Sequence, residues 1–131
     1  MTTAAFPQRR ILVVDDEPLV CDAIKMILQH DGHVVETVGS AEDALTLLEK
    51  GKFDLVITDY KMPRMTGDEL ALAIKALDPA QPVIMMTAYA EMLKSAGHSL
   101  EGIDYMLSKP FLMTDLRTAV AAVTPPAAAV N

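Results

Sequence analysis

The sequence predicts an α/β domain built on a doubly wound, five-stranded parallel sheet with strand order 2-1-3-4-5. Short apolar runs alternate along the chain with segments of helical periodicity, which is the pattern of successive βα units. Several of these runs end abruptly in charged residues. A strand covered on both faces can carry a charge only where it emerges from its cover, so these charges mark strand ends.

Five strands follow from the apolar runs. The first, third and fourth are near-continuous stretches of Val, Ile, Leu and Met, as strands inside a parallel sheet require. The second is the least apolar and suits an edge of the sheet. Right-handed crossovers, with the switch point beside the first strand, give the order 2-1-3-4-5. The expected strands are Arg10–Val14, His33–Thr37, Leu55–Thr58, Val83–Met86 and Ile103–Leu107.

Helical periodicity fills the intervals between these strands, with recognisable start and stop signals. Pro18 suits a first helical turn, and Ser40 can cap the next helix. Gly97 lies in the middle of the fourth interval, where glycine costs about 1 kcal/mol relative to alanine, so a short, frayed or broken helix is expected there. The other helices are expected from Pro18 to Asp31-Gly32, from Ser40 to Gly51, from about Asp68 to Leu77 and from roughly Thr114 to Val123.

The composition fits one domain with one core. Of the 131 residues, 51% are hydrophobic and 22% are charged, without the bias of a disordered chain. The net charge of −7 argues against nucleic acid as a direct partner, because phosphate binding needs clustered Lys and Arg. No apolar run approaches the roughly 18 residues that span a bilayer, and no signal-peptide pattern opens the chain. We therefore expect a cytoplasmic protein that does not enter membranes.

The boundaries of the domain are expected near the two ends of the chain. We interpret residues 1–9 as a flexible N-terminus, residues 10–123 as the domain and residues 124–131 as a disordered Pro/Ala tail. Cys21 is the single cysteine, which excludes an intramolecular disulfide and fits a core thiol.

Chemistry-bearing side chains follow four of the expected strands. Asp15 and Asp16 follow the first strand, Asp59 the third, Thr87 the fourth and Lys109 the fifth. Because the carboxyl ends of parallel strands share one edge of the sheet, these side chains are expected around one crevice. Carboxylates that converge repel one another, so one pKa should rise and a divalent metal should be attracted. The pattern indicates a metal-dependent phosphate site.

The motifs that carry these residues are specific as an ordered set, although each alone is weak. They are Val13-Val14-Asp15-Asp16-Glu17-Pro18, Asp59-Tyr60-Lys61-Met62-Pro63 with Gly67, Thr87-Ala88-Tyr89 and Lys109-Pro110-Phe111. Over about Arg10 to Val123 the chain resembles the receiver domain of bacterial two-component response regulators, of the stand-alone, chemotaxis-regulator-like kind. The resemblance implies a flavodoxin-like (βα)5 fold and a phosphorylation-activated signalling protein.

The resemblance also assigns roles to the site residues. Asp59 matches the phosphoacceptor, which takes a phosphoryl group from a histidine kinase or a histidine phosphotransfer protein. Asp15, Asp16, Asp59 and the backbone carbonyl of Lys61 match the ligands of Mg²⁺, with Mn²⁺ possible as a substitute and Asp15 acting through water. Lys109 would pair with phosphate oxygens and precede a cis proline. Thr87 would donate its hydroxyl to the phosphoryl group and draw its loop toward the site.

The sequence departs from the family at the switch positions. The family usually places an aromatic residue three positions before the lysine, where this chain has Met106, with Tyr105 one place earlier. Since a shift of one residue turns a strand side chain to the opposite face, Tyr105 does not take over that role simply. We expect an intact phosphorylation site with an idiosyncratic output surface. Lys61 and Tyr89 occupy the positions that tune phosphoryl lifetime in the family.

The resemblance implies a regulatory protein that assists its own phosphoryl transfer and dephosphorylation, rather than an enzyme. It would signal by phosphorelay or by docking a protein through the fourth helix, fifth strand and fifth helix, as a monomer or weak dimer. The alternatives are a phosphate-independent pseudo-receiver and the receiver half of a longer regulator. A flavodoxin-type carrier would need an uncharged phosphate loop after the first strand, and an aspartyl-phosphate hydrolase would need Asp-x-Asp there; Asp15-Asp16-Glu17-Pro18 fits neither.

Overall fold

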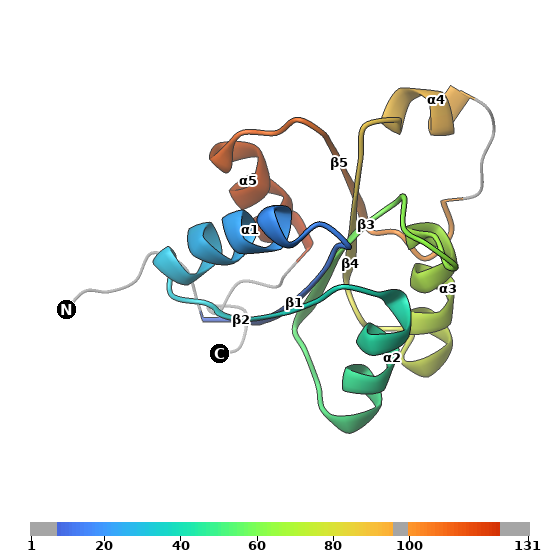
Figure 1. Ribbon diagram of the computed structural model, residues 1–131, viewed down its shortest axis with the longest axis horizontal. Helices are drawn as coiled ribbons and strands as arrows, with labels where there is room; N and C mark the ends of the chain where they lie inside the picture. The colour runs from blue at the N-terminus through green and yellow to red at the C-terminus, as the bar shows by residue number, and fades with distance from the viewer. Residues whose placement is uncertain (1–7, 96–99, 124–131) are drawn as a thin grey trace.

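A computed structural model describes residues 8–95 and 100–123, in which five strands alternate with five helices (Figure 1). The expected (βα)5 arrangement is confirmed. Within this described part, no helix is both long and apolar enough to cross a membrane. The elements are β1 (Arg10–Val14), α1 (Pro18–His30), β2 (Val34–Val38), α2 (Ala41–Lys50), β3 (Leu55–Asp59), α3 (Gly67–Leu77), β4 (Val83–Thr87), α4 (Ala90–Ser95), β5 (Tyr105–Ser108) and α5 (Met113–Val123).

The strands form one parallel sheet in the order β2-β1-β3-β4-β5, as expected. Two strands begin later than the sequence predicts. His33 lies outside β2 because its N–H donates to the carbonyl of Leu28 and closes the turn after α1. Asp104 lies outside β5, and its carboxylate accepts from the backbone N–H of Val83 at 2.8 Å. Both polar residues therefore make contacts just before the strands to which the sequence assigned them, and the apolar Ile103 also lies before β5.

The core forms two layers, one on each face of the sheet. The α1/α5 face joins Ile11, Val13, Ile57 and Ile84 to side chains of α1 and α5, including Leu116. The α2/α3 face joins the alternate strand residues Leu12, Val14 and Val56 to α2 and α3, including Leu70 and Ile74. Figure 1 shows the two helix pairs on opposite sides of the sheet. Full burial of both faces explains why the inner strands read as continuous apolar runs.

Local sequence signals fix the helix ends. Pro18 is the first residue of α1, where its missing N–H costs no hydrogen bond. The Ser40 hydroxyl caps α2 by accepting from the N–H of Asp43 at 3.1 Å. The described part of α4 is only six residues long, consistent with the short helix expected there. Gly97, the N-terminal segment 1–7 and the Pro/Ala tail lie outside the described residues.

Gly67, the first residue of α3, packs directly on the end of β3. Its N–H donates to the carbonyl of Tyr60 at 2.7 Å. A Cβ atom at this position would lie 2.2 Å from the carbonyl oxygen of Asp59 and 3.0 Å from the Cα of Tyr60. The start of α3 can therefore approach the strand end only because residue 67 has no side chain.

We expect Gly67→Ala to lower the free energy of unfolding by about 1–3 kcal/mol or more, because the β3 backbone must move to admit the methyl group. Urea denaturation measures this loss. Gly39→Ala is the matched control, since the nearest heavy atom to its Cβ would be the Asp15 carbonyl oxygen at 4.0 Å. Equal stability of the two variants would contradict the close approach.

His33 should make stability depend on pH. Burial lowers the pKa of this imidazole, and its Nδ1 accepts a hydrogen bond from the N–H of Arg9 at 3.0 Å. The folded state then binds fewer protons than the unfolded state as the pH falls through about 6.5, so stability is lost in that direction.

We expect His33→Gln to flatten the fall in unfolding free energy between about pH 7.5 and pH 5, because it removes the titrating group. Denaturant unfolding across this range provides the measurement. His30→Gln, which removes an exposed imidazole, is the matched control. A slope that His33→Gln leaves intact would exclude His33 as the source.

Candidate functional site

The carboxyl edge of the sheet gathers three carboxylates. Asp15 follows β1, and Asp59 is the last residue of β3, the strand beside β1. One carboxylate oxygen each from Asp15, Asp16 and Asp59 lies within 4.8 Å of the others. Asp15 and Asp59 are buried, whereas Asp16 is exposed. The pairing of two distant strand ends therefore produces the acidic cluster that the sequence predicts.

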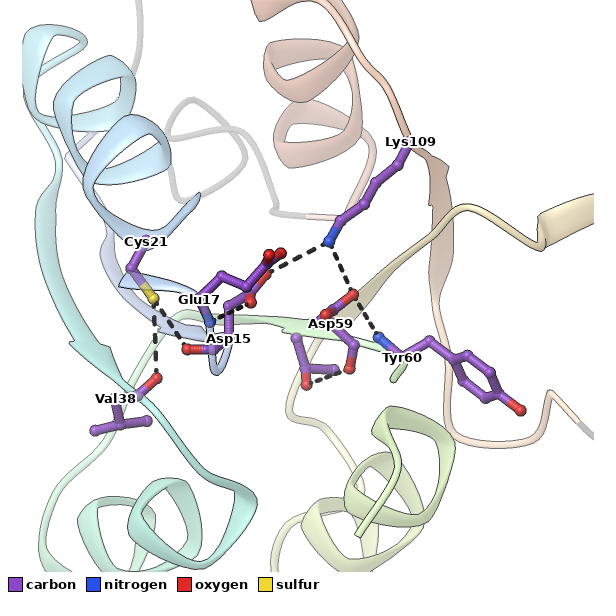
Figure 2. A network of polar contacts seen from close by, with 8 residues as sticks. Asp15, Glu17, Cys21, Val38, Asp59, Tyr60 and Lys109 are labelled. Atoms are coloured by element: carbon purple, nitrogen blue, oxygen red, sulfur yellow. Dashed lines mark hydrogen bonds and ion pairs between the residues drawn. The ribbon is translucent and has the colours of Figure 1, made fainter. Parts of the chain in front are cut away.

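The two carboxylate oxygens of Asp15 have different surroundings. Its Oδ1 accepts a hydrogen bond from the backbone N–H of Glu17 at 2.9 Å. Its Oδ2 is buried without a hydrogen-bond partner, although the ammonium of Lys109 lies 3.5 Å away (Figure 2). Burial raises the pKa of Asp15, and the charge of Asp59 adds to the rise. The expected shift is thus confirmed, but burial contributes more to it than repulsion.

Lys109 joins the two buried carboxylates. Its Nζ donates to Asp59 Oδ1 at 3.0 Å and forms the longer ion pair with Asp15 (Figure 2). Burial acts to lower the pKa of this ammonium, but the hydrogen bond and charge of Asp59 outweigh it, so the pKa is raised. The peptide bond to Pro110 is cis, as the resemblance implied. The positive charge of Lys109 therefore lies within the acidic cluster.

Asp59 is also held by its own backbone. The N–H of Tyr60 donates to Asp59 Oδ1 at 3.0 Å and to the carbonyl of Met86 at 2.8 Å. The Asp59 carbonyl accepts from the hydroxyl of Thr58 at 3.0 Å. Together with Lys109, these contacts fix both the side chain and the peptide group of Asp59.

Thr87 lies at the same edge of the sheet, but its hydroxyl is hydrogen-bonded to a backbone group outside the acidic cluster. It is the last residue of β4 and is 1% exposed. Its hydroxyl accepts from the N–H of Tyr89 at 2.9 Å, while its carbonyl accepts from the N–H of Lys109 at 2.9 Å. The structure therefore brings Thr87 to the site, with its hydroxyl bonded to the N–H of Tyr89 rather than directed to the carboxylates. The side chain of Tyr89 is 41% exposed.

The two candidate switch residues on β5 point to opposite faces of the sheet. Tyr105 packs against the α1/α5 face, as does Leu107 two residues later. Met106, which pairs with Met85 of β4, must point to the other face because strand side chains alternate. Since Met85 and Thr87 are two residues apart on β4, Met106 shares their face. The alternation supports the interpretation that Tyr105 does not replace the usual aromatic residue.

The donor atoms suit a hard divalent cation. The cluster offers carboxylate oxygens, which Mg²⁺ and similar cations prefer. The unpartnered Oδ2 of Asp15 adds a buried oxygen that lacks a hydrogen-bond donor. A cation there would offset the repulsion among the three carboxylates, two of which contact the Lys109 ammonium.

Several groups that hold the site were not predicted from the sequence. They include the N–H groups of Glu17 and Tyr60 and the hydroxyl of Thr58. The thiol of Cys21, buried as expected, donates to the Asp15 carbonyl at 3.4 Å. Thr58 did carry a signal, because it is the polar residue in an otherwise apolar buried run. The backbone donors carried none, since every residue has an N–H.

Known proteins share both the sequence pattern and the fold. The profile of the response regulator receiver domain matches residues 11–121. A CheY-like receiver domain protein from Methanospirillum hungatei JF-1 is 35% identical with a TM-score of 0.80, over 88% of this chain and 92% of that chain. TrrA from Thermotoga maritima, solved in complex with Mg²⁺ and BeF, is 34% identical with a TM-score of 0.76, over 88% of this chain and 98% of TrrA.

Curated relatives include much longer proteins. The transcriptional regulatory protein GlrR of Escherichia coli (strain K12) is 33% identical over 100 residues, which are 76% of this chain and 22% of GlrR. The chain spans less than half the length of this and of TcrA from Mycobacterium tuberculosis, of which it covers 46%. The profile match over most of the chain, with these likenesses, shows that the protein belongs to the response regulator receiver domain family of two-component systems.

Proposed function

We propose that this receiver domain is switched by phosphorylation of Asp59, with the phosphoryl group supplied by a histidine kinase or a histidine phosphotransfer protein. The observation that carries the proposal is the Lys109 ammonium, which contacts Asp59 and Asp15 within a cluster of three carboxylates. This arrangement supplies a carboxylate nucleophile, a cation for phosphate oxygens and oxygen ligands for a metal. Phosphoryl transfer requires these three elements and little further covalent chemistry.

The transfer would need no reactant besides Asp59 and the phosphohistidine of the donor. A carboxylate oxygen of Asp59 attacks the phosphorus of a phosphohistidine, and the phosphorus–nitrogen bond breaks with its electron pair passing to the imidazole. The product on this chain is an acyl phosphate. Lys109, which already donates to Asp59 Oδ1 at 3.0 Å, would pair with a phosphoryl oxygen. Hydrolysis by water would return the free carboxylate.

We propose that the cluster binds Mg²⁺, or Mn²⁺ in its place. Asp16 and Asp59 would each supply a carboxylate oxygen, Asp15 would act through water, and the carbonyl of Lys61 would complete the protein ligands. When bound, the cation supplies charge neutralisation and orientation for phosphate oxygens. The proposal is supported by the oxygen-only cluster and by TrrA, which was solved with Mg²⁺ and BeF.

The proposed function is regulatory, as for receiver domains in general. The site would assist its own phosphorylation and dephosphorylation rather than turn over a substrate. With a net charge of −7, the domain itself is not expected to bind nucleic acid. We propose that it acts in the cytoplasm, without binding membranes, and that it meets its kinase partners there.

The conformational change that follows phosphorylation would begin at Thr87. To donate to a phosphoryl oxygen, its hydroxyl must move relative to the N–H of Tyr89, from which it now accepts at 2.9 Å. Met106 shares the sheet face of Thr87 and would follow this movement as a flexible substitute for the usual aromatic residue. We propose that α4, β5 and α5 form the docking surface, whose exposed residues include Met92. The domain would act there as a monomer or weak dimer, or pass the phosphoryl group onward.

A receiver within a longer regulator is the second candidate. It is favoured by relatives such as GlrR, of which the chain covers 22%. In that case the same site would control an attached domain instead of a separate protein. A phosphate-independent docking module is the outcome if Asp59 takes no phosphoryl group.

Incubation with Mg²⁺ and acetyl phosphate should add the mass of one phosphoryl group, measured by intact-mass spectrometry. Asp59→Asn and a metal-chelated sample should show no addition, because each lacks a required component. Asp22→Asn, at an exposed aspartate of α1, is the matched control and should label normally. Failure of the wild-type protein to label, with Mg²⁺ binding shown separately, would exclude phosphorylation as the switch.

Tyr89→Ala should accelerate phosphoryl loss severalfold from a wild-type lifetime of minutes or longer, because a smaller side chain would shield the acyl phosphate less from water. The decay of the phosphorylated species after removal of the donor measures this rate. Leu72→Ala, which shortens an exposed side chain on α3, should decay at the wild-type rate. Identical decay of wild type and Tyr89→Ala would refute the shielding role.

A further inference from the structure

We propose that Thr58 is a positioning residue for Asp59. Its hydroxyl fixes the peptide group that follows the Asp59 Cα, and that peptide group in turn orients the Asp59 carboxylate. The inference rests on the proposed function, since it assigns Thr58 a part in preparing the acceptor for phosphoryl transfer.

Thr58 is a fully buried polar residue inside β3. It lies beside Val14 of β1 and Met85 of β4 in the sheet register. Because strand side chains alternate, the Thr58 side chain points to the same face as that of Val56, the α2/α3 face. The Asp59 side chain points to the opposite face. The Thr58 side chain thus acts from the face of the sheet opposite to the carboxylate that it is proposed to position.

The Thr58 hydroxyl supports a carbonyl at the point where the pairing of β3 with β1 ends. The register between β1 and β3 stops at Val14 and Thr58, so Asp59 lies one residue beyond the last β1 partner. The Asp59 carbonyl instead accepts from Thr58 Oγ1 at 3.0 Å. The backbone of Gly67 in α3 packs closely against the same carbonyl, because a Cβ atom at position 67 would lie 2.2 Å from the Asp59 oxygen. One donor and one steric wall therefore fix the oxygen end of this peptide group.

The nitrogen end of the same peptide group contacts the acceptor. Because the peptide is planar, fixing its C=O also fixes the direction of the Tyr60 N–H. That N–H is shared between Asp59 Oδ1 at 3.0 Å and the Met86 carbonyl at 2.8 Å, and the same Asp59 oxygen accepts from Lys109 at 3.0 Å (Figure 2). A rotation of the peptide would weaken the first contact and let the carboxylate turn about its side-chain bonds. The Thr58 hydroxyl opposes that rotation.

The test combines phosphorylation kinetics with the amide proton of Tyr60. Thr58→Val removes the hydroxyl while keeping the shape of the side chain, and Thr58→Ser keeps the hydroxyl. Thr46→Val is the control, because Thr46 makes the same kind of bond to the Glu42 carbonyl, at 3.1 Å, on an exposed part of α2. The readouts are the maximal labelling rate with acetyl phosphate at saturating Mg²⁺ and the proton shift of the Tyr60 amide in the unphosphorylated protein.

We expect Thr58→Val to lower the maximal rate about three- to tenfold, as loss of one orienting hydrogen bond would. The Tyr60 amide proton should move upfield, because its bond to the carboxylate weakens. Thr58→Ser should restore both values toward wild type, and Thr46→Val should change neither. A purely structural role for Thr58 would lower stability without this paired change in rate and amide shift.

A wild-type rate and a wild-type Tyr60 shift in folded Thr58→Val would overturn the proposal. A serine variant as impaired as the valine variant would do the same, because the hydroxyl would then not be the active group. If Thr58→Val does not fold, the comparison of Thr58→Ala with Thr58→Ser applies the same criteria. If wild type itself does not label, the proposed function fails, while the Tyr60 shift still decides whether Thr58 orients the peptide.

Discussion

The compensation of charge at the carboxyl edge of the sheet is the constraint on which this structure depends. Two buried carboxylates, Asp15 and Asp59, lie together at the ends of neighbouring strands, and one ammonium group serves both. Burial raises the pKa of Asp15, so the fold disfavours its charged form. Lys109 offsets only part of this cost, because Asp15 Oδ2 makes no hydrogen bond to it. The site is therefore built to gain from an additional cation.

The packing of α3 explains how Asp59 is held without crowding its backbone. Gly67 lets the helix start against the Asp59 carbonyl, and the backbone around that contact turns so that the Tyr60 N–H meets the Asp59 carboxylate. The carboxylate and the carbonyl of Asp59 are consequently contacted by different groups, and the peptide to Tyr60 links the two. Lys109 and the Tyr60 N–H act on the carboxylate, while α3 and the Thr58 hydroxyl act on the carbonyl.

The alternation of side chains along β5 places Tyr105 and Met106 on opposite faces of the sheet. The α1/α5 face carries Tyr105 as part of its apolar layer, so this ring is committed to core packing. The opposite face carries Met106 beside Met85, with Thr87 two residues further along β4. The flexible thioether of Met106 therefore lies on the same sheet face as Thr87.

The sequence by itself determined the strand order, the helix starts at Pro18 and Ser40, and the convergence of Asp15, Asp59 and Lys109, because apolar runs, caps and strand-end charges are local signals. Only the tertiary structure decided that His33 and Asp104 lie outside the predicted strands, since the His33 N–H donates to the Leu28 carbonyl and the Asp104 carboxylate accepts from the N–H of Val83. It alone also decided the burial of Asp15 and the peptide contacts of Asp59. Those depend on how closely β1, β3 and α3 approach one another, which no local pattern encodes.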